Sequence, residues 1–236
     1  NVSELSGGSN AVVTGVVFGS PNNRIENCVI KNFAIDVGSP THDGIEPYAL
    51  RIHGATDCTI GPGTFFITDN TLNPTYPTNS FRPYVIQSAS NCVVKDVFFS
   101  PCYRGGSIAA NDIPKSYVTS ITFDGVTIGP HENGGNGLCK INGDTIGKIE
   151  WKDSTFNVGN GMTAFYIPDF ESSKVCHSDY LDVNNCTFLA ASGSSNTRAI
   201  DFVPNGGGTG NMLGKLRFIN NNLVNITTTD TAAVIQ

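Results

Sequence analysis

The chain has 236 residues, a formal net charge of −6 and only 14% charged residues. This acidic balance argues against nucleic acid as a partner, because binding to phosphates requires clustered Lys and Arg. No apolar run approaches the roughly 20 residues that cross a bilayer, so we expect no membrane insertion. The 26 glycines and the abundant Asn, Ser and Thr disfavour helices and favour an all-β fold.

The first segment, "SELSGGSNAVVTGVVFG", predicts either a short extra repeat or a cap. From residue 27 onwards one pattern recurs, with three apolar columns and a turn former in each copy. The second apolar residue of the copies is Ile30, Ile60, Val94, Phe123, Trp151, Val183 and Phe218, at intervals of 30, 34, 29, 28, 32 and 35 residues. Two positions earlier stand Cys28, Cys58, Cys92, Ile121, Ile149, Leu181 and Leu216. Five positions later stand Ile35, Phe65, Phe99, Ile128, Phe156, Phe188 and Leu223.

Each copy predicts a short strand with alternating inward and outward residues, a tight turn and another short strand. The turn formers are Asn32, Pro62, Asp96, Gly125, Asp153, Asn185 and Asn220. A looser strand also recurs, as in "YALRI" at 48, "YVIQS" at 84 and "LCKIN" at 138. Two or three strands in about 30 residues are typical of one rung of a parallel β-helix.

We therefore expect one all-β domain over residues 1–236, a right-handed parallel β-helix of about seven rungs that is a segment of a longer chain. The cysteines of the first column are expected to be core thiols. Asn and Asp side chains near the turns are expected to bond from rung to rung. Trp151 stands at an inward position, which predicts a core residue rather than a sugar platform.

On this rung pattern, over roughly residues 10–230, the chain resembles the pectin lyase-like group of parallel β-helices. Within that group it is most similar to the body of bacteriophage tailspikes and related receptor-binding fibres. The resemblance implies a homotrimer on a virion tail that binds, and in some members cleaves, a bacterial cell-surface polysaccharide such as capsule or O-antigen. Two alternatives stay open, a secreted polysaccharide lyase or hydrolase and a non-catalytic β-helical adhesin. No cofactor or metal is expected, because neither the cysteines nor the histidines have ligand spacing.

Three aspartates follow the looser strand on consecutive rungs: Asp112, Asp144 and Asp169. Equivalent positions on adjacent and alternate rungs are about 5 and about 10 Å apart. These separations bracket the carboxyl spacings of retaining and inverting glycosidases, about 5 Å and 6.5–9.5 Å. We predict this column as catalytic; the alternative is that the aspartates only cap turns.

Further residues are predicted to bind substrate. Beside the aspartate column these are Glu171, Tyr117, Tyr166 and Phe170. The longest insertion, residues 69–84, adds Tyr76, Arg82 and Tyr84, since long loops on rigid scaffolds often carry binding. The segment "THDGIEPYALRIH" adds Asp43 and Glu46 within a dense group of titratable residues. The alternatives are subunit packing for the insertion and an ordinary loop for the Asp43 segment.

Overall fold

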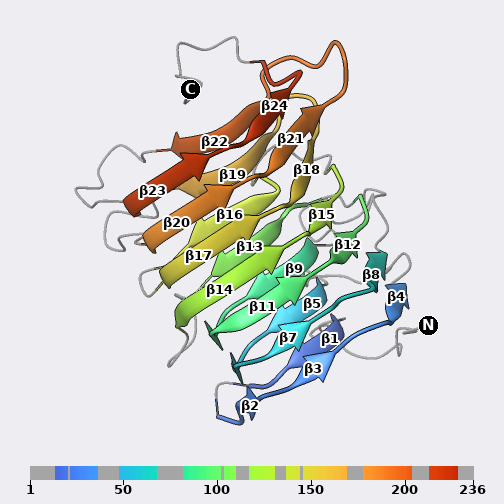
Figure 1. The fold of residues 1–236 in the computed structure, drawn as a ribbon, viewed down its shortest axis with the longest axis vertical. Coiled ribbons are helices and arrows are strands. Elements are labelled where there is room, and N and C mark those ends of the chain that lie inside the picture. Colours follow the sequence, from blue (N-terminus) through green and yellow to red (C-terminus); the bar gives the residue numbers. More distant parts are fainter. Residues whose placement is uncertain are drawn as a thin grey trace, which may run out of the picture.

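The chain forms a coil of parallel strands, shown in the computed structural model of Figure 1. The structure describes residues 14–20, 22–36, 48–67, 82–101, 104–109, 117–130, 137–143, 146–168, 178–203 and 213–227. The chain passes through three sheets, A, B and C, and returns to the first. This confirms the predicted all-β parallel β-helix. Within the described ranges, no helix is long and apolar enough to cross a membrane.

The strands are named in chain order. Sheet A contains β1 (Thr14–Phe18), β5 (Tyr48–Ile52), β9 (Arg82–Ile86), β13 (Gly106–Ala109), β16 (Cys139–Asn142), β19 (Thr163–Pro168) and β22 (Arg198–Val203). Sheet B contains β2 (Ile25–Glu26), β3 (Val29–Ile30), β6 (Ala55–Thr56), β7 (Thr59–Ile60), β10 (Ala89–Ser90), β11 (Cys92–Lys95), β14 (Val118–Asp124), β17 (Ile146–Lys152), β20 (Ser178–Asn184) and β23 (Leu213–Ile219). Sheet C contains β4 (Ala34–Asp36), β8 (Thr64–Ile67), β12 (Val97–Phe99), β15 (Thr127–Ile128), β18 (Thr155–Val158), β21 (Thr187–Ala190) and β24 (Asn222–Val224).

The solenoid makes about five turns rather than the seven that the repeat predicted. The first and last copies supply the strands at the two ends of the stack. Their inward side chains, such as Ile30 and Leu223, are only partly buried. The matching side chains between them, such as Ile60 and Phe188, are fully buried. An end copy has a neighbour on one side only, so it does not enclose a core of its own.

Strand register confirms the inward columns predicted from the sequence. The column that runs from Ile30 to Phe218 pairs from copy to copy without a slip. In its middle, the rings of Phe123 and Trp151 stack with centroids 3.9 Å apart and an interplanar angle of 3°. Trp151 is fully buried, as predicted. The core is therefore a stack of side chains that repeats with the spacing of the strands.

In the inward column predicted from Ile35 to Leu223, the prediction is wrong at one position, Phe65. Its side chain is 50% exposed, whereas Phe66 is fully buried and pairs with Ile35 on one side and Phe99 on the other. The preceding turn contains Gly61 and Gly63, both at positive φ, and is one residue longer than in the other copies. A shift of one residue exchanges the two faces of a strand, so Phe66 takes the inward position.

Residues in the left-handed region mark the corner between sheets B and C. They are Asn32, Asp96, Asp153, Asn185 and Asn220, with φ between 47° and 58°, together with Gly125 at 65°. Asn, Asp and Gly enter this region at the least cost, which explains the column of turn formers. The side chains also bond along the stack, since the Asn185 amide donates to Asp153 Oδ1 at 2.5 Å. The predicted bonding between rungs is thus confirmed at this corner.

A second corner explains why an Asn or Asp directly precedes the cysteine in each of the first three copies. Asn27, Asp57 and Asn91 have φ between 50° and 53° and divide sheet B into pairs of short strands. The thiol that follows bonds back to the carbonyl two residues earlier, as Cys58 Sγ does to Thr56 O at 3.2 Å. Cys92 repeats this bond to Ser90 O at 3.5 Å.

The cysteines within the described ranges are free thiols, and most are buried. Burial raises the pKa of the Cys186 thiol to about 11. Cys186 follows a left-handed Asn at the other corner, and its thiol makes the same backward bond, to Asn184 O at 3.4 Å. Ser154 takes this role after Asp153, with a bond to Lys152 O at 2.8 Å. Cys58, Cys92 and Cys186 are thus core thiols that also bond to the turns.

One core side chain crosses from its own turn into the next. Tyr84 of β9 is fully buried, and its strand neighbour on β13 is a glycine, Gly106. A Cβ on Gly106 would lie 2.2 Å from Tyr84 Cζ, so the tyrosine ring fills the place of the missing side chain. Beyond Gly106, in register on β16, stands Cys139, whose side chain is fully buried. Burial raises the pKa of the Cys139 thiol to about 12.

Candidate functional site

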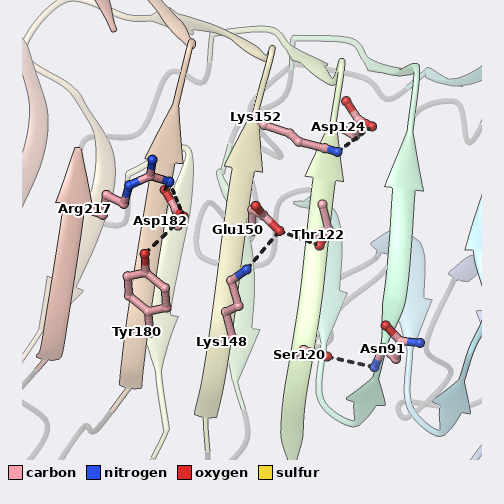
Figure 2. A network of polar contacts seen from close by, with 10 residues as sticks. All are labelled: Asn91, Ser120, Thr122, Asp124, Lys148, Glu150, Lys152, Tyr180, Asp182 and Arg217. Atoms are coloured by element: carbon pink, nitrogen blue, oxygen red, sulfur yellow. Dashed lines mark hydrogen bonds and ion pairs between the residues drawn. The ribbon is translucent and has the colours of Figure 1, made fainter. Parts of the chain in front are cut away.

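Sheet B presents a dense group of charged and polar side chains on its outer face, most of which Figure 2 shows. This polar face consists of Ser120, Thr122 and Asp124 on β14, Lys148, Glu150 and Lys152 on β17, Tyr180 and Asp182 on β20, and Lys215 and Arg217 on β23. The strands are seven residues long and in register. Outward residues of neighbouring strands therefore lie about 4.8 Å apart along the solenoid.

Asp182 is the most buried carboxylate of the polar face, at 3% exposure. Arg217 Nη1 donates to both of its oxygens, at 3.3 and 3.0 Å, and the Tyr180 hydroxyl donates to Oδ2 at 3.2 Å. The hydrogen bond with Asp182 raises the pKa of Arg217 above its ordinary value. A buried carboxylate requires such partners, so this group ties β20 to β23.

The other carboxylates of the polar face are also paired. Glu150 Oε2 lies 3.2 Å from Lys148 Nζ and accepts a hydrogen bond from Thr122 at 3.2 Å. Lys152 Nζ lies 3.2 Å from Asp124, whose hydrogen bond raises the pKa of that lysine. These pairs are partly exposed, and each contributes little to stability by itself. Together they satisfy the carboxylates of this face.

Two of these carboxylates have a spacing that suggests glycoside hydrolysis. Glu150 and Asp182 are in register on neighbouring strands, so their positions are about 4.8 Å apart, close to the spacing of retaining enzymes. Such enzymes use one protonated carboxyl group and one free carboxylate. Here each carboxylate is already bonded to a cation of the protein. We therefore assign the pair to the stability of the face.

The outer face of sheet C is different, because it carries no charge over most of its length. Its strands from β8 to β24 contain only uncharged residues. We call its central outward row the neutral row: Ala34, Phe65, Phe98, Thr127, Thr155, Thr187 and Asn222, in register from β4 to β24. The rings of Phe65 and Phe98 are in contact, with centroids 6.2 Å apart.

The side chains of the neutral row are exposed at its ends and at Phe65 and partly exposed between them. Phe65 is 50% exposed, and Leu189, on the next outward row of β21, is 39% exposed. The hydroxyls of the three threonines make no hydrogen bond within the described part of the chain. The row therefore presents two aromatic rings and three available hydroxyls at intervals of one strand.

The predicted catalytic aspartates Asp112, Asp144 and Asp169 lie outside the described residues. The strands that precede them, β13, β16 and β19, are adjacent in sheet A, as the prediction requires. Whether the three carboxylates meet stays a prediction. Glu171, Phe170, Tyr76, Asp43 and Glu46 also lie outside the described ranges.

Four of the predicted binding residues are described. Tyr166 is a partly exposed outward residue of β19, and burial, with a smaller effect from Asp201, raises the pKa of its phenol. Arg82 is buried at the start of β9 and donates to Gly105 O at 3.3 Å. Tyr84 was wrongly placed among the contact residues, because it belongs to β9 and its ring is in the core.

Tyr117, the fourth, is 40% exposed, and Arg24 lies over one face of its ring at 4.9 Å from the centroid. The Arg24 guanidinium also donates to Ala55 O at 2.7 Å and to Ser88 Oγ at 2.7 Å. It therefore joins four successive turns at the edge of sheet B. Arg24 belongs to no repeating column, so nothing in the sequence pattern pointed to it.

Within the described ranges, no group of three or more His, Cys, Asp and Glu side chains could hold a metal ion. Comparison of the chain with protein-family models, with curated proteins and with solved structures finds no match.

Proposed function

We propose that this chain binds a bacterial cell-surface polysaccharide, either capsule or O-antigen, as the β-helical body of a tailspike-type receptor-binding protein on a phage virion. The observation that carries the proposal is the register of the outward rows. Equivalent side chains recur along the solenoid at intervals of one strand, about 4.8 Å. A polymer of repeating sugars can make the same contact with each successive turn, so that individually weak contacts add up.

Hydrolysis is a separate prediction, which depends on Asp112, Asp144 and Asp169. The paired carboxylates of the polar face favour a second candidate, a β-helical adhesin that binds glycans without cleaving them. A homotrimer remains part of the tailspike proposal. A secreted polysaccharide lyase or hydrolase is the remaining alternative.

The test is incubation of the purified chain with a panel of bacterial capsules and O-antigens. Retention of the protein by at least one polysaccharide is expected, and absence of binding across a broad panel would refute the proposal. Reducing ends and ultraviolet absorbance are followed in the same samples. New reducing ends without absorbance would indicate a hydrolase, to be checked with Asp112→Asn, Asp144→Asn and Asp169→Asn. New absorbance would indicate a lyase.

A further inference from the structure

The neutral row and the polar face differ in the ligand chemistry that they can serve. On the polar face the carboxylates form ion pairs with lysine and arginine side chains of the same face. A ligand that bound to these carboxylates or cations would first have to break the ion pairs. The neutral row has hydroxyls without partners in the described part of the chain and an aromatic pair, of which Phe65 is exposed and Phe98 partly exposed. Its groups are therefore available without loss of an existing contact.

The chemistry of the neutral row matches that of a sugar chain. A pyranose ring has an apolar C–H face, which packs on aromatic side chains, and hydroxyls at its edge. Phe65 and Phe98 offer the first kind of contact, and Thr127, Thr155 and Thr187 offer the second. A charged polymer would find no counter-charge on the sheet C strands β8, β12, β15, β18, β21 and β24 and would lose hydration there.

The direction of the row also matters. Its members belong to successive turns, so the row runs along the solenoid axis and across the strands (Figure 1). A bound chain in this direction meets one side chain per strand, at intervals of about 4.8 Å. This interval is close to the length of one sugar ring in an extended chain.

We propose that the outer face of sheet C binds an uncharged polysaccharide that lies along the neutral row. This inference rests on the proposed function and adds the location of the site and the class of the glycan. A second copy of the chain fits the row less well. Homodimer interfaces are more apolar at their centre than the rest of the surface, whereas the centre of this row is three threonines.

The test uses affinity electrophoresis in gels that contain one polysaccharide each. Dextran, mannan and laminarin are the neutral probes, and alginate and polygalacturonate are the acidic probes. We expect retardation by at least one neutral probe, unchanged between low and high salt, because no ionic contact is involved. Phe65→Ala with Phe98→Ala should weaken binding by roughly tenfold or more, and Thr155→Val by about two- to tenfold.

Matched controls lie on the polar face. Thr122→Val repeats the threonine substitution on sheet B, and Lys215→Ala removes a cation from the same surface; both should bind as the unchanged protein does. Circular dichroism melts verify the fold of each variant. Thr155→Val keeps the shape of the side chain, so it tests the site even if the double Phe variant is unstable.

The outcomes separate this inference from the proposed function. Binding to acidic probes only, or binding that Thr155→Val and the double Phe variant leave unchanged, would overturn the neutral row as the site while the proposed function stands. Failure to bind any of these probes or the bacterial panel would overturn both. A change of oligomeric state in the double Phe variant, measured by light scattering and without loss of glycan binding, would instead make this face an interface between copies.

Discussion

The place where Tyr84 fills the space of Gly106 gives a sharp test of the core. In a strand, replacing Gly by Ala ordinarily stabilises by about 0.5–1 kcal/mol, because Gly loses more backbone entropy on folding. Here the new Cβ would lie 2.2, 2.3 and 2.5 Å from Tyr84 Cζ, Cε1 and Cε2. Carbon atoms in contact are normally about 3.5–4 Å apart, so the ring would have to move by more than 1 Å.

The Tyr84 ring is fully buried and packs against three other aromatic rings. Its centroid is 5.4 Å from that of Phe99, 5.5 Å from that of Phe123 and 6.5 Å from that of Trp151. Overpacking of a dense core destabilises by about 1–3 kcal/mol. We therefore expect Gly106→Ala to destabilise the protein by about 1–3 kcal/mol, opposite in sign to the ordinary effect.

The second half of the test removes the Tyr84 ring by substitution. Tyr84→Ala alone should destabilise by about 3–5 kcal/mol, as for other large aromatic residues. In that background Gly106→Ala should stabilise by about 0.5–1 kcal/mol, which makes the coupling between the two sites about 1.5–4 kcal/mol. Tyr84→Phe is the matched control: it keeps the ring, so Gly106→Ala should remain destabilising there.

The assay is urea unfolding followed by circular dichroism, with all variants at one temperature and pH. A Gly106→Ala variant as stable as the original protein would refute the position of the ring. A penalty that persisted in the Tyr84→Ala background would show that the crowding comes from the backbone and not from the tyrosine.

Three further predictions concern a corner, an ion pair and a core thiol. Asp153 has φ of 51°, so Asp153→Ala should destabilise by about 1 kcal/mol more than Asp153→Gly, measured by urea unfolding; equal effects would contradict a conformational origin. Arg217→Ala should lower the urea midpoint because it leaves buried Asp182 without its cation, and adding Asp182→Asn should recover part of the loss; no recovery would mean that the arginine acts by packing alone. The pKa of Cys139 is raised from 9.0 to about 12, so the unfolded chain releases this proton first and stability should fall as pH rises from about 9 towards 12. Between pH 8 and pH 10.5 the Cys139 thiol should account for a loss of about 2 kcal/mol in the free energy of unfolding. The Cys139→Ala variant, unfolded at the same two pH values, should lack this loss.

The sequence was sufficient to predict the class of fold and most of the core. The columns led by Ile30 and by Cys28 are periodic, and periodicity is what strand register requires. The prediction failed at Phe65 because the turn through Gly61 and Gly63 adds one residue, and a local insertion is invisible to a fixed spacing. Tyr84 was misassigned for a related reason. Its ring occupies the space beside Gly106, which belongs to the next copy of the repeat, so no spacing within its own copy indicates that it is buried.

The surfaces were harder to predict than the core. Outward residues obey no apolar rule, so the sequence could not show that Glu150 and Asp182 would each meet a cation. The neutral row passed unnoticed because its threonines are about 30 residues apart and are ordinary strand residues individually. Only the register of β15, β18 and β21 brings them into one line. Asp112, Asp144 and Asp169 lie outside the described ranges.

The position of Trp151 makes tryptophan fluorescence a specific probe of the middle of the solenoid. It is the single tryptophan of the chain, it is fully buried, and it lies on β17, with other strands of sheet B stacked on both sides. In a stack whose units contact only their neighbours, loss of structure starts at the ends, where side chains such as Ile30 and Phe218 are half buried. Indole emission should therefore stay blue while the ends fray, and shift to the red only when the middle opens. The difference between this signal and circular dichroism would measure how far fraying proceeds before the solenoid melts.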